Sequence, residues 1–382
     1  MPLEFTRLPP ELLDAIASHV PMPDLLALCR TNHGLYSICL RWIYHSLSPS
    51  TVACTVGLLK ALISNKPAAT CVKVFDIHLP LDDVLTRPAK TQAHDNLLFS
   101  SFAHTHFPRL YDCLIPLCTD TAGFLRLHPT IIRLGVLPDA DPSAPPVYPG
   151  LSEVSLPALR DFNGPAGVAR QVIAGSPIQV VTISWDRGLD EGYPAVLAAF
   201  LPAQTPLRMM RNLVYVWDAA LLLAIAKHLP YLALLSIWNI ALSGAPPVEG
   251  VLETYYDVLK TVILDLPHLK TIVCISHVEH TPPTPDDLAL EFRAVRECGS
   301  RSAALRSCTL TSNTMWVRGV ENFWYPCAAN KDRAESQWRL LWLVGLVLRA
   351  PTEFPGYAAE VERVLGKAQW AAALNKLDLS AD

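Results

Sequence analysis

The chain carries few charged residues, no concentrated basic segment and no long uninterrupted apolar run. Charged residues make up 17% of its 382 residues, hydrophobic residues make up 51%, and the net charge is −4. Without a basic block, nucleic acid is not an expected partner. The apolar run at residues 338–348 is shorter than the about 20 residues that span a bilayer. We therefore expect a large buried core and no membrane partner.

Sequence motifs of common enzymes are also missing. The chain contains no GxGxxG, GxxxxGK[ST], GxSxG or HExxH pattern. The pairs His104/His106 and His277/His280 supply fewer ligands than a zinc site needs. Ser, His and Asp are common in the chain, so a catalytic triad formed by residues far apart in the sequence is not excluded. The sequence therefore predicts no enzyme: no catalytic residues, no cofactor and no metal.

Cysteine usage and the first residues indicate a compartment. Ten cysteines are spread along the chain, and no two have CxxC spacing. The start, with Leu3, Glu4 and Phe5, lacks the basic residues and apolar core of a secretory signal. Both features predict reduced, mostly buried thiols in an intracellular protein, either cytoplasmic or nuclear.

The most regular pattern lies at residues 8–47, LPPELLDAIASHVPMPDLLALCRTNHGLYSICLRWIYHSL. It predicts three short helices, with Pro9 in the first turn of the first helix, Asp24 as the cap of the second and Asn32 as the cap of the third. The spacing of apolar residues predicts one buried face on each helix. These faces are formed by Leu12, Leu13, Ile16 and Val20, then Leu25, Leu28 and Cys29, then Leu35, Ile38, Cys39, Trp42 and Ile43.

A unit of roughly 40 residues is too small to bury much surface alone, so it packs on the rest of the chain or offers an apolar face to a partner. The order Leu8-Pro9-x-Glu11-Leu12-Leu13-x-x-Ile16, then Asp24-Leu25-Leu26-x-Leu28, then the third helix resembles an F-box. The resemblance implies docking on a Skp-type adaptor, and through it on the cullin scaffold of a ubiquitin ligase. The implied adaptor-binding residues are Leu8, Pro9, Leu12, Leu13, Ile16, Leu25 and Leu28. The alternative is that these leucines form the core of an N-terminal helical bundle.

Beyond residue 50 one short sequence pattern recurs, in which a proline and a short spacer precede a predicted apolar strand. The prolines at positions 108, 129, 157 and 177 follow at steps of 21, 28 and 20 residues, and further copies start at 230 and 267. Leucine-rich repeats have periods of about 20–29 residues. The arrangement resembles the irregular leucine-rich arrays found behind F-boxes in fungal proteins, which implies a curved parallel sheet. A conventional α/β domain with a flat parallel sheet is the alternative.

The pattern predicts the positions of individual elements. Strands are expected within residues 71–79, 108–115, 129–136, 157–162, 178–185, 212–217, 231–238, 268–276 and 308–317. Helices are expected at residues 55–64, 120–127, 166–174, 194–201, 219–229, 254–266, 286–298, 332–349 and 358–377. Proline-rich loops are expected at 138–150, 243–250 and 281–287, one of them with a role in client binding. The acidic pairs at 82–83 and 286–287 are expected at helix starts, and the aromatic segment 316–325 in the core.

The expected fold class is α/β, in three parts. A small three-helix F-box-like module covers residues 1–50, an irregular leucine-rich-repeat-like solenoid with a curved parallel sheet covers 51–285, and a last repeat with a helical C-terminal cap covers 286–382. The expected function is that of a substrate-recognition adaptor in a Skp–cullin–F-box ubiquitin ligase, which holds a protein client on the sheet. The alternatives are an F-box scaffold without ubiquitin transfer and an α/β enzyme with a deep pocket at its strand ends. No arginine cluster stands out, which argues against a phosphorylated client.

Overall fold

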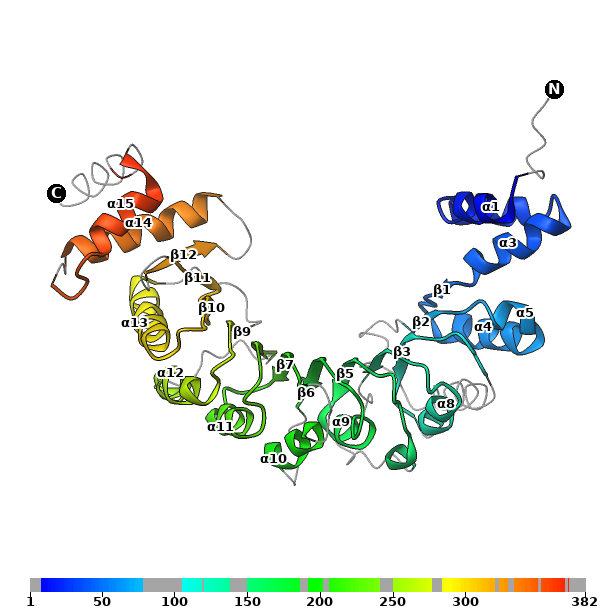
Figure 1. Ribbon diagram of the computed structural model, residues 1–382, viewed down its shortest axis with the longest axis horizontal. Helices are drawn as coiled ribbons and strands as arrows, with labels where there is room; N and C mark the ends of the chain where they lie inside the picture. The colour runs from blue at the N-terminus through cyan, green and yellow to red at the C-terminus, as the bar shows by residue number, and fades with distance from the viewer. Residues whose placement is uncertain are drawn as a thin grey trace. The chain divides into compact units, whose positions relative to one another are not determined.

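A computed structural model describes residues 8–77, 105–118, 120–137, 150–185, 192–201, 206–240, 250–276, 284–319, 323–328, 333–349, 352–367 and 370. Within these residues the fold is α/β, with twelve strands that are mostly parallel and helices between them (Figure 1). The chain divides into two units. Unit 1 comprises Met1–Leu189 and Pro202–Thr205, and unit 2 comprises Asp190–Leu201 and Pro206–Asp382.

Unit 1 begins with the three helices that the sequence predicts: α1 (Pro10–Ala17), α2 (Met22–Cys29) and α3 (His33–Ile43). The predicted cap of α3 is confirmed, because the Asn32 side chain accepts a hydrogen bond of 2.6 Å from the Gly34 amide. The predicted cap of α2 is wrong, since Pro21 holds that position and Asp24 lies inside the first turn. Proline fits the first helical turn, so α2 starts earlier than its prolines suggested.

The rest of unit 1 alternates strands and helices. Its elements are β1 (Ser46–Leu47), α4 (Val52–Ser64), α5 (Lys66–Ala69), β2 (Val74–Asp76), β3 (Asp112–Pro116), α8 (Thr121–Leu127), β4 (Arg133–Leu137), η3 (Leu151–Glu153), β5 (Asp161–Pro165), α9 (Ala166–Val172) and β6 (Val180–Ser184). Each strand from β1 to β6 pairs in parallel with the next one along the chain.

Unit 2 continues the alternation and then changes strand direction. Its elements are α10 (Gly192–Leu197), η4 (Ala198–Phe200), β7 (Met209–Val214), α11 (Ala219–His228), β8 (Leu234–Asn239), α12 (Val251–Val262), η5 (Ile263–Asp265), β9 (Thr271–Ser276), α13 (Pro285–Arg301), β10 (Ser307–Thr309), β11 (Thr314–Arg318), β12 (Trp324–Ala328), α14 (Arg333–Arg349) and α15 (Tyr357–Leu365). Strands β7 to β10 are parallel, whereas β11 and β12 are antiparallel to their neighbours.

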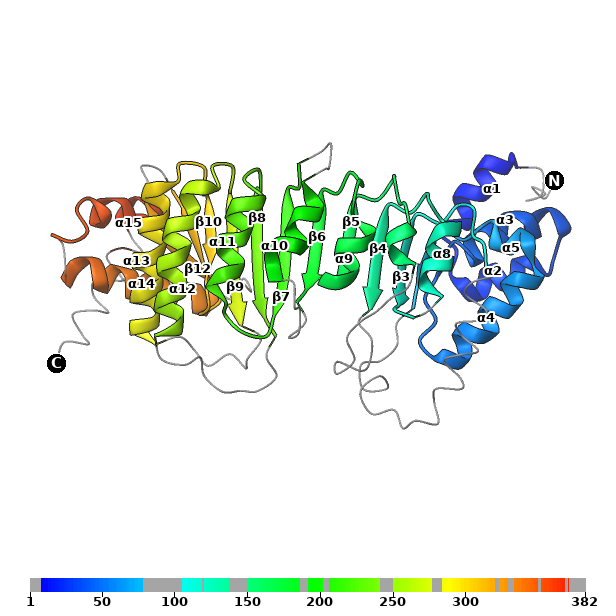
Figure 2. The same ribbon diagram turned by 90° about the horizontal axis from the view of Figure 1, so that it is seen from below.

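Helices α8 and α9 lie on one face of the strands of unit 1, and α11, α12 and α13 lie on one face of the strands of unit 2, as Figure 2 shows. Side chains alternate between the two faces of a strand. In β7 the buried residues Met210, Asn212 and Val214 alternate with the half-buried Met209, Arg211 and Leu213. The buried set forms the core with the helices, and the half-buried set lies on the opposite face, which we call the open face.

Most predicted strands and helices are confirmed, and the exceptions have physical reasons. The single strand predicted at 308–317 is wrong: it is the antiparallel pair β10 and β11, joined by a turn in which Asn313 has a φ of 57°. Strand β12 was not predicted, because its sequence WYPCA contains a proline. The predicted loop at 281–287 is wrong for residues 285–287, which form the first turn of α13. There Thr284 and Asp287 make a capping box, so the predicted helix start at Asp286 and Asp287 is confirmed.

Other predictions are confirmed or lie outside the described residues. In the aromatic segment predicted to lie in the core, Trp316, Phe323 and Trp324 are buried, with exposures of 0%, 4% and 0%, and Tyr325 is half-buried. Of the predicted loops, residues 138–149, 243–249 and 281–283 lie outside the described ranges. The acidic pair at 82–83, one member of the first histidine pair (104) and both members of the second (277 and 280) also lie outside those ranges.

Candidate docking surfaces

The N-terminal helices have a small core of their own. It consists of the buried residues Leu13, Ala17, Leu25, Leu35, Ile38 and Cys39, against which Leu8, Val20, Leu28, Cys29, Trp42 and Ile43 pack. Helix α3 contributes the largest share, and both α1 and α2 pack on it. The predicted buried faces of the second and third helices are therefore confirmed.

The predicted adaptor-binding residues fall into three groups. Leu13 and Leu25 belong to this core, with exposures of 7% and 3%. Leu8 and Leu28 are half-buried against it, and Pro9, Leu12 and Ile16 are exposed. The prediction that Leu12, Leu13 and Ile16 share one face is wrong, because successive residues of a helix are rotated by about 100°. Leu13 therefore faces the core while Leu12 and Ile16 face away from it.

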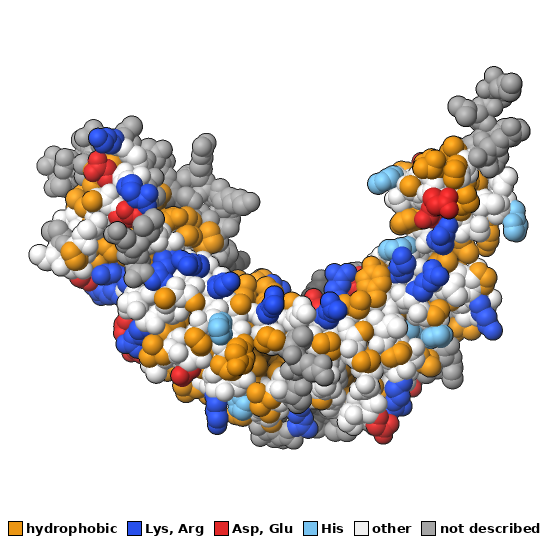
Figure 3. All heavy atoms as spheres, in the orientation of Figure 1, with side chains coloured by type: hydrophobic (Ala, Val, Ile, Leu, Met, Phe, Trp, Pro, Cys, Tyr) orange, Lys and Arg blue, Asp and Glu red, His pale blue; other side chains and the backbone are white. Residues whose placement is uncertain are grey.

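Two helices carry pairs of exposed apolar side chains one turn apart. Leu12 and Ile16 of α1 are 52% and 40% exposed, and Met22 and Leu26 of α2 are 45% and 50% exposed. Tyr36 of α3 is a further exposed side chain, with an exposed fraction of 40%. We call these five residues the N-terminal apolar set; Figure 3 shows hydrophobic side chains gathered over these helices. Sequence reasoning missed Met22, Leu26 and Tyr36, although the i, i+4 spacing of the first two is a signal for a second apolar stripe.

Leaving such side chains in water is costly, since burial of one large apolar side chain contributes about 1.5–3 kcal/mol. Isolated exposed leucines are common on protein surfaces, whereas grouped ones indicate an interaction site. The orientation of α1 is also fixed. The Asp14 carboxylate accepts a hydrogen bond of 3.1 Å from Trp42 Nε1 and lies 3.2 Å from the Arg41 guanidinium, both on α3.

The open face of unit 2 is rich in apolar residues. Cross-strand neighbours there include the row Leu213, Trp238 and Ile275, and all three are half-buried. The Arg211 guanidinium lies over the Trp238 ring, 4.9 Å from its centroid, and Trp238 Nε1 donates to Ser236 Oγ at 2.7 Å. These two contacts fix the orientation of the indole ring on the open face, where it offers an apolar surface.

The open face of unit 1 carries more charged and polar residues, beside half-buried apolar ones such as Leu114 and Leu137. Asp112, Arg133 and Asp161 are cross-strand neighbours on β3, β4 and β5, and the Arg133 guanidinium lies 2.5 Å from the Asp112 carboxylate. Asn163 is exposed on β5 and its neighbour Thr182 is half-buried on β6. An apolar partner segment is therefore accommodated better by the open face of unit 2.

A pocket of about 370 Å³ lies where α11 and α12 begin. It is lined by Trp217, Ala219, Gly250, Val251, Thr254 and Tyr255. The Tyr255 ring packs edge-on against Trp217 with centroids 5.1 Å apart, and burial raises the pKa of its hydroxyl well above the ordinary value. None of these lining residues carries a carboxylate, imidazole, thiol or ammonium group, so they offer no pair for general acid–base chemistry.

A buried carboxyl group has a structural explanation. Glu291 of α13 is 1% exposed, and burial raises its pKa. It accepts hydrogen bonds from the Ser312 amide at 2.7 Å, from Ser312 Oγ at 2.6 Å and from Trp316 Nε1 at 3.2 Å. The group thus fixes the β10–β11 turn to α13 rather than facing a substrate.

Metal ligands do not gather in the described part of the chain. No three His, Cys, Asp or Glu side chains there could hold a metal ion, and all ten cysteines are free thiols. The Nε2 atom of the buried His128 accepts a hydrogen bond of 2.8 Å from the Phe107 amide.

Of the helices described, none is long and apolar enough to cross a membrane.

Comparison with known proteins adds no assignment. Neither a protein-family model nor a curated protein matches the sequence.

Proposed function

We propose that the protein is the substrate-recognition adaptor of a Skp–cullin–F-box type ubiquitin ligase. The N-terminal helices would bind the Skp-type adaptor, and a degenerate leucine-rich-repeat solenoid behind them would bind a protein client. One observation carries the proposal: the F-box-like segment folds as three helices with their own core and still exposes Leu12, Ile16 and Leu26. Parallel strands that alternate with helices on one face support the solenoid.

The structure sharpens which residues would contact the adaptor. Pro9, Leu12 and Ile16 are exposed and available for direct contact. Leu13 and Leu25 would act by positioning the helices from within the core. Met22, Leu26 and Tyr36 extend the proposed contact surface beyond the residues that the sequence predicted.

The client would lie on the open face of unit 2. Its row of Leu213, Trp238 and Ile275 offers an apolar surface on the face opposite to α11, α12 and α13. The protein would contribute proximity by holding a client lysine near ubiquitin that other subunits carry. Proximity alone supplies several kcal/mol of a reaction barrier. This role requires no catalytic residue in the chain.

The test is binding to a purified Skp-type adaptor. The double variant Leu12→Glu/Ile16→Glu removes two side chains that are 52% and 40% exposed, and Leu223→Glu/Leu127→Glu is a matched control with the same exposures on α11 and α8. Loss of two buried leucine-sized contacts should weaken binding by about two orders of magnitude or more. The control should bind like the unchanged protein. Equal binding by both double variants would remove the N-terminal apolar set from the interface.

A scaffold without ubiquitin transfer would use the same adaptor surface. The two roles differ in what happens to the client when the protein is depleted. A ligase subunit predicts slower degradation of its client, whereas a scaffold predicts unchanged turnover.

A further inference from the structure

Basic residues from distant parts of the sequence meet at one edge of the sheet in unit 2. Arg208, Lys270 and Arg306 immediately precede β7, β9 and β10, and Arg318 ends β11, which runs in the opposite direction. We call these four residues the basic edge. The Arg306 amide donates to the Lys270 carbonyl at 2.8 Å, and the Arg318 amide donates to the Arg306 carbonyl at 2.9 Å. Neighbouring strands are about 4.8 Å apart, so the backbones of Lys270, Arg306 and Arg318 lie close together.

Strand β8 separates Arg208 from the other three. The Ala233 amide donates to the Arg208 carbonyl at 2.9 Å, and the Lys270 amide donates to the Ala233 carbonyl at 2.8 Å. Arg208 therefore lies two strands from Lys270 on the same edge. Figure 3 shows Lys and Arg side chains one after another over the ends of β7, β9 and β10.

Three of these side chains are exposed and have no acidic partner among the described residues. Arg208, Lys270 and Arg306 are exposed, and no described carboxylate lies within ion-pair distance of any of them. Arg318 is fixed in place, since its guanidinium donates to the carbonyls of Ser302 at 2.8 Å and Leu305 at 3.0 Å. Burial and the neighbouring charge of Arg306 lower the pKa of Arg318.

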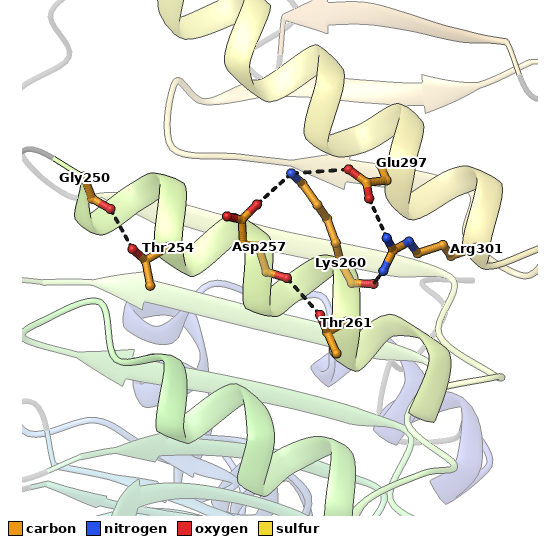
Figure 4. Close-up of polar contacts among 7 residues, drawn as sticks. All are labelled: Gly250, Thr254, Asp257, Lys260, Thr261, Glu297 and Arg301. Carbon is orange, nitrogen blue, oxygen red and sulfur yellow. Dashed lines mark hydrogen bonds and ion pairs between the residues drawn. The ribbon is translucent and has the colours of Figure 1, made fainter.

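The carboxylates of Asp257 on α12 and Glu297 on α13 are already paired. Lys260 of α12 lies 2.9 Å from the Asp257 carboxylate and 3.3 Å from the Glu297 carboxylate of α13. Glu297 also pairs with Arg301 at 2.5 Å, as Figure 4 shows. These carboxylates are occupied by the cations of α12 and α13, so they do not neutralise the basic edge.

The strands of unit 2 supply no compensating charge either. In unit 1, the first strand positions carry Asp112 and Asp161 on either side of Arg133. The matching positions of unit 2 carry uncharged residues, namely Met209, Leu234, Thr271 and Ser307. Unit 2 therefore presents a concentrated positive edge in a chain whose net charge is −4.

We propose that the basic edge binds an acidic segment of a partner protein, a stretch rich in Asp and Glu. Charge complementarity is the argument, since arginine guanidinium groups bind carboxylates through paired hydrogen bonds, and Lys270 and Arg306 immediately precede two adjacent strands on an edge that also carries Arg208. As a statement about the client, the proposal rests on the proposed function. Peptide binding itself is independent of the adaptor and is measured without it.

The experiment titrates the full-length protein into a fluorescein-labelled peptide of alternating Glu and Gly, with a Gln–Gly peptide of the same length as the neutral control. The test variant is Lys270→Glu/Arg306→Glu. The matched control is Lys60→Glu/Lys66→Glu, which reverses two exposed charges on α4 and α5 of unit 1. Circular dichroism verifies that both variants fold.

We expect the acidic peptide to bind the unchanged protein and the control at about 0.01 M ionic strength and to bind more weakly at about 0.15 M, where charges are screened beyond about 8 Å. The test variant should bind at least about tenfold more weakly. Equal binding by the test variant, equal binding of the Gln–Gly peptide, or no binding at low salt would overturn the proposal. Tighter binding of a single-stranded oligonucleotide than of the peptide would assign the edge to nucleic acid instead. If the unchanged protein binds the adaptor but not the acidic peptide, only this inference is refuted; if it binds the peptide but not the adaptor, only the proposed function is refuted.

Discussion

The Asp14 carboxylate on α1 accepts a hydrogen bond from the Trp42 indole on α3 at 3.1 Å, and it lies 3.2 Å from Arg41. This contact fixes the rotation of α1 and therefore the direction in which Leu12 and Ile16 point. Asp14→Ala should lower the free energy of unfolding of the N-terminal helices by about 1–2 kcal/mol, because it removes a charge-assisted hydrogen bond. Arg41→Ala should cost less than about 1 kcal/mol, since that ion pair is exposed. Hydrogen exchange of the α1 amides measures both, and equal effects would contradict the role of the indole bond.

Two adjacent leucines should behave in opposite ways. Leu13 is 7% exposed and Leu12 is 52% exposed. Leu13→Ala should therefore destabilise the N-terminal helices by about 2–5 kcal/mol through the cavity that it leaves. Leu12→Ala should change stability by less than about 0.5 kcal/mol and weaken adaptor binding. Exchange protection of the α3 amides distinguishes the two, and comparable losses would mean that Leu12 is also a core residue.

These leucines show what the sequence could and could not predict. Periodicity located the three helices, because proline and Asn32 mark their ends. Periodicity could not show which of Leu12 and Leu13 faces inward, since both are apolar. The packing of α1 on α3 determines which of the two is buried. That packing depends on Asp14 and Trp42, which are far apart in sequence and carry no periodic signal.

Stability should depend on pH through one buried imidazole. His128 Nε2 accepts from the Phe107 amide at 2.8 Å and Nδ1 donates to the Phe124 carbonyl at 2.7 Å, so the ring is neutral. Burial lowers its pKa from 6.5 to about 4. Between these values the unfolded chain binds the proton and the folded one does not, so stability should fall as the pH decreases.

The shift of the His128 pKa corresponds to a loss of about 3 kcal/mol in the free energy of unfolding as the pH decreases. Urea unfolding at several pH values between about pH 7 and about pH 4 measures this loss. The free energy of unfolding should depend less on pH in His128→Gln than in the unchanged protein. An unchanged slope in that variant would show that His128 does not cause the loss.

A glycine inside α13 allows close packing of a tryptophan. A Cβ atom added to Gly299 would overlap the indole ring of Trp324 on β12, which is fully buried. Gly299→Ala should therefore destabilise unit 2 by about 1–3 kcal/mol through overpacking. Gly57→Ala in α4 is the control, since nothing lies within 4 Å of its added Cβ, and it should stabilise by about 0.5–1 kcal/mol. Thermal unfolding compares them, and a rise in melting temperature for both variants would contradict the contact.

The same region shows why part of unit 2 could not be predicted. The helix expected at 286–298 continues through Gly299 to Arg301, because the glycine serves packing rather than ending the helix. The basic edge was also invisible in the sequence, where Arg208, Lys270 and Arg306 are tens of residues apart. Only the parallel register of the strands brings such residues together.

The central claim is that the N-terminal apolar set binds a Skp-type adaptor, and calorimetric titration of that adaptor into the intact chain tests it most directly. The account predicts saturable binding with a negative heat-capacity change, because Leu12, Ile16 and Leu26 would leave water. It also predicts that Leu12→Glu/Ile16→Glu abolishes the binding heat while Leu223→Glu/Leu127→Glu preserves it. No binding by the intact chain would contradict the claim and reduce the three helices to a packing bundle.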